Sequence, residues 1–102
     1  MKFCIACSMP LDEVHGLGTA TKDGQVCAFC LGEDGNLKSC EEIFESGVQF
    51  FMTVDGVESR DFAERLTRKN MNDLEYWQSH HHACLDGEQA SHKEFHEIIA
   101  KL

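Results

Sequence analysis

The chain has 102 residues, and its 18 acidic residues against 9 lysines and arginines give a formal net charge of −9. Nucleic-acid affinity depends on basic clusters that contact phosphates, so this balance disfavours a nucleic acid as the partner. No apolar run approaches the length of a membrane span, which disfavours a membrane protein. The length fits one domain, or a small module with an extension. Because no signal peptide is recognisable and the cysteines stand in closely spaced pairs, the expected compartment is the reducing cytoplasm.

Two C-x₂-C pairs define the first part of the chain. Cys4 and Cys7 form one pair, Cys27 and Cys30 form the other, and nineteen residues separate the pairs. This spacing is typical of a tetrahedral zinc site, in which each sulfur lies about 2.3 Å from the ion. Two disulfides or a redox dithiol are the alternatives. We predict that the four cysteines bind one zinc ion, which is structural because four thiolates leave no open coordination position for catalysis.

The residues between and after the two pairs predict a β-hairpin and a loop. Asp23-Gly24 lies between two short strand-like stretches, and an Asp-Gly pair supplies the positive φ of a tight turn. The glycine-containing segment 32–36 predicts a loop, after which Leu37 is expected to close over the module. A module of about 35 residues buries too little surface to fold without a metal or disulfides. We therefore predict a zinc ribbon over residues 1–37, in which the ion replaces a hydrophobic core.

Serines followed three positions later by glutamate predict helix starts in the rest of the chain. Ser39 and Glu42 fit a capping box, and so do Ser91 and Glu94. The last of these helices is expected over Glu88–Leu102. Helical spacing of apolar residues supports both helices, with inward positions at Ile43, Phe44, Val48 and Phe51 in the first and at Phe95, Ile98, Ile99 and Leu102 in the last.

Two more helices are predicted between these. Ser59 is the expected cap of one, which should stop near Asn70, while Asn72 and Glu75 resemble a cap-and-box start for the other. The predicted fold class is therefore α+β: a small zinc ribbon with two knuckles and a hairpin, followed by three or four short helices. These helices form a helical extension, residues 38–102, packed on the ribbon. Aromatic residues are expected to supply most of its core, namely Phe44, Phe50, Phe51, Phe62, Trp77 and Phe95.

The cysteine pairs stand within a longer motif. Residues 3–11 have the sequence F-C-I-A-C-S-M-P-L, and residues 27–30 have the sequence C-A-F-C. With Gly18-Thr19, Asp23-Gly24 and Gly35, these segments resemble the putative zinc-ribbon family, and the resemblance extends over residues 3–78. It implies a ribbon with zinc on the four cysteines, and it describes a metal site rather than an activity. The later matching residues are Glu41, Glu42, Ile43, Ala63, Leu66, Met71, Leu74 and Trp77, and the departures from the family pattern are Ser8, Val26 and Asn72, none of them a ligand.

Two cysteines and five histidines lie beyond the predicted ribbon. Cys40 and Cys84 are expected to be free, small buried hydrophobic residues, although Cys40 falls in the first turn of a helix, where a thiol becomes more reactive. A C-terminal cluster could hold a second metal ion or act as a sensor, and a polar surface rich in histidine is the alternative. Its members are His80, His81, His82, Cys84, His92 and His96, of which His92 and His96 share one side of a helix.

No arrangement of nucleophile and base can be recognised in the sequence, so we predict that the protein is not an enzyme. The expected function is that of a small zinc-binding protein whose ribbon contacts another protein, with a homodimer as the simplest assembly. Nucleic-acid binding and metal or redox sensing are the alternatives. The one basic cluster, formed by Arg65, Arg68 and Lys69, is expected to be a solvated helix face.

Overall fold

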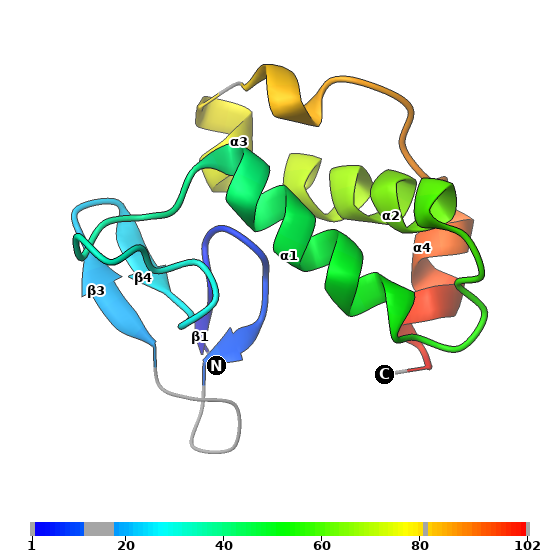
Figure 1. Cartoon of the computed structure of the whole chain (residues 1–102), viewed down its shortest axis with the longest axis horizontal. Helices are drawn as coiled ribbons and strands as arrows, with labels where there is room; N and C mark the ends of the chain where they lie inside the picture. Colours follow the sequence, from blue (N-terminus) through cyan, green and yellow to red (C-terminus); the bar gives the residue numbers. More distant parts are fainter. Residues whose placement is uncertain (1, 12–17, 81, 102) are drawn as a thin grey trace.

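The computed structural model of the chain describes residues 2–11, 18–80 and 82–101. A small β-rich part and a helical part lie side by side, and the chain passes from the first to the second at the start of α1 (Figure 1). The predicted α+β class is confirmed. The elements are β1 (Lys2–Phe3), β2 (Pro10–Leu11), β3 (Thr19–Thr21), β4 (Gly24–Val26), α1 (Cys40–Met52), α2 (Arg60–Asn72), α3 (Glu75–Ser79), η1 (Ala83–Leu85) and α4 (His92–Ile99).

The β-rich part consists of two antiparallel pairs, β1 with β2 and β3 with β4. In the second pair Thr21 lies opposite Gly24, whose φ of 137° gives the turn the positive φ that the sequence predicted. A Cβ atom at Gly24 would lie 3.2 Å from the side chain of Ile5, so the turn also packs closely on the first knuckle. Leu37 pairs with Leu31 and packs on the buried residues of the ribbon, as predicted.

Both predicted capping boxes are present. The Ser39 hydroxyl accepts a hydrogen bond from the Glu42 backbone N–H at 3.2 Å, and the Glu42 carboxylate accepts one from the Ser39 N–H at 3.4 Å. Ser91 and Glu94 make the same two bonds at the start of α4. This box fixes the first turn of α4 after Ser91, so the helix is shorter than the predicted range Glu88–Leu102. Leu102, the last residue of that range, lies outside the described residues.

The predicted cap at Asn72 is wrong. α2 continues to Asn72, and the side-chain amide of this residue donates to the backbone oxygens of Arg68, at 2.8 Å, and Leu85, at 3.2 Å. α3 instead begins after Leu74 and has no side-chain cap. Asn72 therefore holds η1 against the end of α2, while the cap predicted at Ser59 is confirmed by its bond from the Phe62 N–H.

The buried side chains form two clusters. One lies between the ribbon and the helices, and the other lies among α1, α2 and α4. Phe51 and Trp77 are buried as predicted. The prediction that Phe50 belongs to the core is wrong, since 45% of its surface is exposed. Successive helix residues point about 100° apart, so α1 buries Phe51 and leaves Phe50 at the rim. Phe44, Phe62 and Phe95 are half-buried against the second cluster.

Gly47 allows α1 and α2 to approach each other closely. A Cβ atom at this position would lie 2.7 Å from Cγ2 of Thr67, which is fully buried and donates its hydroxyl to the backbone oxygen of Ala63 at 2.7 Å. Glycine in a helix interior costs up to about 1 kcal/mol relative to alanine. The close contact between the two helices offsets that cost. Among the described residues, no helix is both long enough and apolar enough to cross a membrane.

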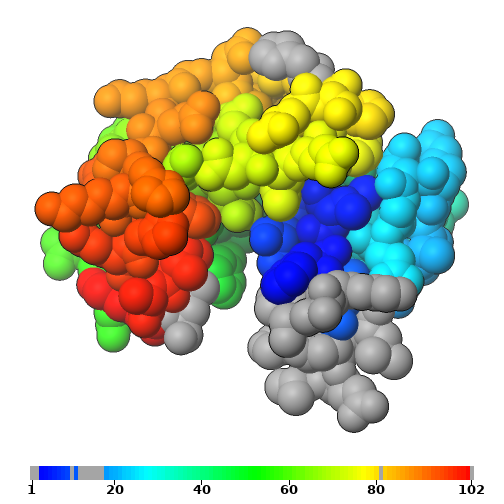
Figure 2. All heavy atoms as spheres, turned by 180° about the vertical axis from the view of Figure 1, so that it is seen from behind, coloured from blue at the N-terminus to red at the C-terminus, as the bar shows by residue number. Residues whose placement is uncertain are grey.

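α4 closes the second cluster. Ile98 is only 4% exposed, while the neighbouring Ile99 is 38% exposed. The rings of Phe95 and Phe51 meet edge to face with their centroids 6.3 Å apart, and the Ala90 N–H donates to the backbone oxygen of Arg65. In the view from behind, α4 and the ribbon lie at opposite ends of the molecule (Figure 2). α4 therefore belongs to the helical core, away from the ribbon.

Replacing Ile98 with alanine should lower the free energy of unfolding by about 2–5 kcal/mol, because it leaves a cavity in a closed cluster. Ile99→Ala removes the same atoms from an exposed position and should change the free energy of unfolding by less than about 1 kcal/mol. Urea unfolding of the two variants, followed by circular dichroism, measures the difference. Equal losses in the two variants would mean that α4 does not pack as described.

Candidate metal centre

Two tight turns bring the four predicted ligands together. In the first, the Ser8 N–H donates to the Cys4 backbone oxygen at 2.9 Å, and the Cys4 N–H donates to the Met9 oxygen at 2.8 Å. In the second, the Cys30 N–H donates to the Cys27 oxygen at 3.1 Å. Each turn thus holds two cysteines of one pair on the same side of the backbone, and the hairpin between the pairs brings the turns face to face.

The sulfur atoms of Cys4, Cys7, Cys27 and Cys30 all lie within 4.8 Å of one another. The Cys7–Cys27 and Cys27–Cys30 separations are 3.5 and 3.6 Å. In a tetrahedron with Zn–S bonds of about 2.3 Å, neighbouring sulfurs lie about 3.8 Å apart. The cluster therefore fits a zinc ion. The alternative of two disulfides does not fit, because bonded sulfurs lie about 2.05 Å apart and these four cysteines are free.

The ligand set is closed. Cys4, Cys27 and Cys30 are buried, Cys7 is half-buried, and Ala6 between the first two ligands has no exposed surface. Four thiolates complete the tetrahedron of a zinc ion, so no position is left for a water or a substrate. Sets of four cysteines are common in structural zinc sites, whereas catalytic sites keep one position open.

Mutual hydrogen bonding divides the four thiols into two kinds. Contact with Cys27 lowers the pKa of Cys4 and raises the pKa values of Cys7 and Cys30, while contact with Cys30 lowers the pKa of Cys27 to about 7. In this arrangement Cys7 and Cys30 therefore keep their protons more readily than Cys4 and Cys27 do. Zinc binds thiolates, so its binding must release at least these two protons.

Ser8 is the departure from the family pattern nearest to the ligands. It has a φ of 69°, in the left-handed region, and it is the non-glycine residue with positive φ among the described residues. A side chain in this conformation costs about 1–2 kcal/mol, which glycine avoids. The backbone of the knuckle thus explains the glycine of the family pattern, and the bonds around Cys4 keep Ser8 in the same conformation.

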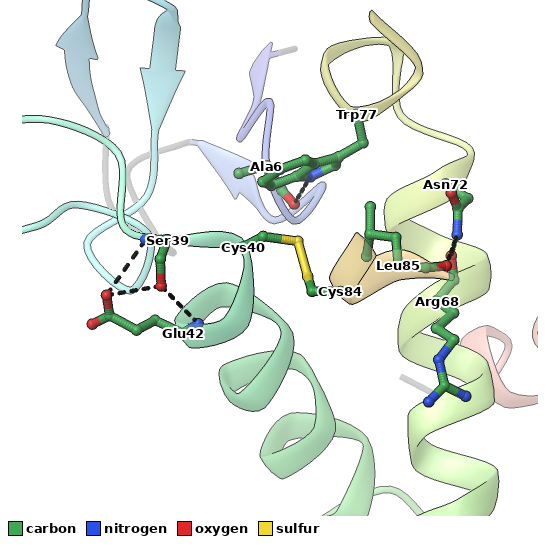
Figure 3. The surroundings of a disulfide bond; sticks show 9 residues. All are labelled: Ala6, Ser39, Cys40, Glu42, Arg68, Asn72, Trp77, Cys84 and Leu85. Atoms are coloured by element: carbon green, nitrogen blue, oxygen red, sulfur yellow. Dashed lines mark hydrogen bonds between the residues drawn. A yellow bond between two sulfur atoms is a disulfide. The ribbon is translucent and has the colours of Figure 1, made fainter. Parts of the chain in front are cut away.

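Two side chains from the helices bind the backbone of the first knuckle. Trp77 donates its indole N–H to the Ala6 oxygen at 2.9 Å, and Asn70 donates its amide to the Cys7 oxygen at 3.0 Å. Figure 3 shows the indole lying over Ala6. The ribbon is therefore joined to α2 and α3 by hydrogen bonds as well as by apolar packing. The predicted division of the chain into a ribbon and a helical extension at residue 37 stays a prediction.

The sequence analysis expected Cys40 and Cys84 to be free, and this expectation is wrong. The two cysteines form a disulfide with a Cα–Cα distance of 6.3 Å (Figure 3). η1 lies against the start of α1, which places the two thiols in reach of each other across 44 residues of sequence. The only sequence signal was that two cysteines remain once the zinc ligands are assigned. Since disulfides persist mainly in oxidising compartments, the cysteine pattern alone no longer supports the cytoplasm, which stays a prediction.

In the part of the chain that the structure describes, the C-terminal histidines and Cys84, for which a second metal site was one alternative, do not come together as a metal site. Among the described residues, only the four ribbon cysteines bring three or more ligand atoms together, and His81 lies outside those residues. Cys84 is used in the disulfide. The other histidines make separate ring contacts: His80 stacks on Tyr76 at 4.4 Å, His82 meets the edge of Trp77 at 5.4 Å, and the rings of His92 and His96 lie 4.1 Å apart on α4.

The comparison with protein families found a match. The model of the family described as the putative zinc ribbon domain matches residues 3–78, which include all four ribbon cysteines and extend through α3. Comparison with the curated proteins and comparison with the solved structures each found no match to the chain. The family match agrees with the ligand geometry and with one zinc ion per chain.

Removal of zinc should unfold the ribbon, because metal binding at such sites supplies folding free energy on the order of 10–16 kcal/mol. We expect one tightly bound zinc per chain, and we expect Cys27→Ser to abolish it. Metal analysis and amide NMR spectra before and after chelation test this. Ser8→Gly is the matched control, which should keep the zinc. Well-dispersed signals from the ribbon residues in the metal-free protein would contradict the prediction.

Zinc affinity should rise steeply with pH. The pKa values of Cys7 and Cys30 are raised by their neighbouring thiols where the knuckles are folded. In an unfolded ribbon each thiol has its ordinary pKa of about 8.5 and is also protonated at neutral pH. Protons therefore compete with the ion as pH falls in either state. Release of at least two protons predicts an increase in affinity of at least about 100-fold per pH unit. Competition with a chelator of known affinity at about pH 6 and about pH 7 measures it. An affinity independent of pH would rule out two protonated thiols.

Proposed function

Because this chain belongs to the putative zinc ribbon domain family, we propose that its zinc ion is structural and that its ribbon is a non-catalytic module that binds another protein. The closed set of four cysteines supports the first part, since a catalytic zinc needs an open position. The second part rests on the surface of the ribbon.

Two exposed phenylalanines beside the zinc ligands carry the proposal. Phe29 is 61% exposed and immediately precedes Cys30, while Phe3 is 50% exposed and immediately precedes Cys4. The sulfurs of Cys4 and Cys30 belong to the same cluster, so both aromatic residues start from the rigid backbone around the ion. Aromatic side chains on a rigid support lose little conformational entropy on binding and are enriched at protein interfaces.

The charge of the ribbon indicates the chemistry of the partner. Four thiolates on a divalent ion leave about two negative charges at the centre. Residues 1–37 add five acidic residues against two lysines. The proposed partner is therefore a protein with an apolar pocket bordered by lysine or arginine side chains, because complementary charges favour association.

The predicted basic cluster supports a protein partner over a nucleic acid. Phosphates are bound by clusters of lysine and arginine, and nearby acidic groups weaken the positive field of such a cluster. Two of the three cations lie beside acids of the chain: Arg65 beside Asp61 at 3.1 Å and Lys69 beside Asp73 at 2.8 Å.

Replacing Phe29 with serine should weaken partner binding without loss of zinc. Interface aromatics of this kind contribute about 2 kcal/mol or more when truncated, which corresponds to a loss of about 30-fold in affinity. The binding partner is first captured from native cells with the wild-type chain and then titrated against purified variants. Phe50→Ser is the matched control, because Phe50 is similarly exposed but lies on α1, outside the ribbon.

Three outcomes would contradict the proposal. Equal binding by the Phe29→Ser and Phe50→Ser variants would exclude the ribbon face. Saturable, salt-dependent binding of DNA or RNA at micromolar protein would favour the nucleic-acid alternative. Capture of no other protein, together with a dimeric mass in sedimentation that Phe29→Ser reduces to a monomer, would make a second copy of this chain the partner.

A further inference from the structure

The Cys40–Cys84 disulfide coexists in one chain with four cysteines that must be thiolates to bind zinc. It joins the first residue of α1 to η1, outside the ribbon (Figure 3). We propose that Cys40 and Cys84 form a reversible thiol–disulfide exchange site, opened by a dithiol protein or by glutathione-class thiols, while zinc protects the ribbon cysteines from the same chemistry. This inference concerns a site separate from the proposed binding face.

The two sulfurs of the disulfide differ in access. Cys84 is half-buried on a single turn of 3₁₀-helix at the surface, whereas Cys40 is 3% exposed. An incoming thiolate must approach the sulfur it attacks along the S–S bond, so the more accessible sulfur is the site of attack. The structure therefore assigns Cys84 as the sulfur attacked and Cys40 as the leaving group.

The position of Cys40 suits a leaving thiolate. Cys40 is the first residue of α1 after the Ser39 cap, where the helix dipole favours a negative charge. A hollow of about 330 Å³ borders Cys40 and is lined also by Lys38, Trp77 and His82. Thiols that are stabilised as thiolates leave faster in exchange reactions. Access at Cys84 and stabilisation at Cys40 thus favour the same direction of attack.

The exchange is balanced with a dithiol reductant. One of its thiolates attacks Sγ of Cys84, the Cys40–Cys84 bond breaks, and Cys40 leaves as a thiolate that takes up a proton. The second thiol of the reductant loses its proton and attacks the reductant sulfur of the mixed disulfide, which releases Cys84. The reductant loses two electrons and becomes a disulfide, and Cys40 and Cys84 become thiols. Oxidation of the pair follows the same steps in reverse.

Non-covalent contacts keep η1 in place when the disulfide opens. Leu85 is buried, and its backbone oxygen accepts a hydrogen bond from Asn72 at 3.2 Å. The Arg68 guanidinium donates to the Glu88 oxygen on the far side of η1. Opening should therefore loosen residues 82–86 locally without unfolding the chain. His82 contacts the ring of Trp77, the single tryptophan, so the change can be followed by its fluorescence.

The test equilibrates the zinc-loaded full chain, without oxygen, in mixtures of reduced and oxidised glutathione. Samples are quenched in acid, alkylated and analysed by mass spectrometry. We expect the reduced fraction of the pair to rise from one tenth to nine tenths as the ratio [GSH]²/[GSSG] increases by about 80-fold, as for a two-electron couple. The curve should be the same from the oxidised and the reduced side, with one zinc retained throughout.

Each other outcome would overturn the proposal. A pair that stays oxidised in excess reduced glutathione is a permanent structural disulfide, and a pair that stays reduced in excess oxidised glutathione is two free thiols. Loss of zinc in step with reduction would mean that the ion does not protect the ribbon. A brief reaction with glutathione, quenched before resolution, should place at least ten times more adduct on Cys84 than on Cys40, and the opposite ratio would overturn the assigned direction.

A matched variant separates exchange from a general effect of thiols. Cys40→Ser keeps Cys84 and all ribbon ligands, so it should retain zinc and form a glutathione adduct at Cys84. That adduct has no second thiol in the chain to resolve it. The Trp77 fluorescence of the Cys40→Ser variant should lack the sharp two-electron transition of the wild type. A transition identical to that of the wild type would show that the fluorescence change does not come from the disulfide.

Discussion

The binding of four thiolates to one ion is the constraint on which the ribbon depends. Its strands are two or three residues long, and its hairpin alone could not overcome the entropy of ordering the chain. Among the described residues of the ribbon, the buried side chains other than the ligands are Ala6, Leu11 and Val26, while the larger ones in the same cluster, such as Trp77, come from the helices. The ion thus takes the place that a cluster of large side chains takes in the helical part.

The helical part in turn depends on the ribbon through a few directed contacts. Trp77 reaches the backbone between Cys4 and Cys7, and Asn70 reaches the oxygen of Cys7 itself. Both side chains bind backbone groups that the knuckle turn leaves free, so they recognise the shape of the folded knuckle. Buried polar groups of the ribbon are satisfied in this way by helices far along the sequence.

The features predicted correctly from the sequence are those set by residues close together in the chain. The C-x₂-C spacing, the Asp23-Gly24 turn and the two serine–glutamate caps are local signals, and the structure contains all of them. The errors concern residues whose environment depends on packing between distant elements. Cys84 pairs with Cys40 only because η1 lies on α1, and Asn72 holds η1 instead of capping α3.

The two covalent closures of this chain enclose separate stretches of it. Zinc ties residues 4 to 30, and the disulfide ties residues 40 to 84, so the two loops do not overlap in sequence. During synthesis the four zinc ligands emerge before Cys84, so the zinc loop can close before the disulfide loop is complete. A protease that cuts between residues 41 and 83 of the oxidised chain would leave its two pieces covalently joined, whereas a cut at residues 31–39 would separate ribbon from helices except for their non-covalent contacts.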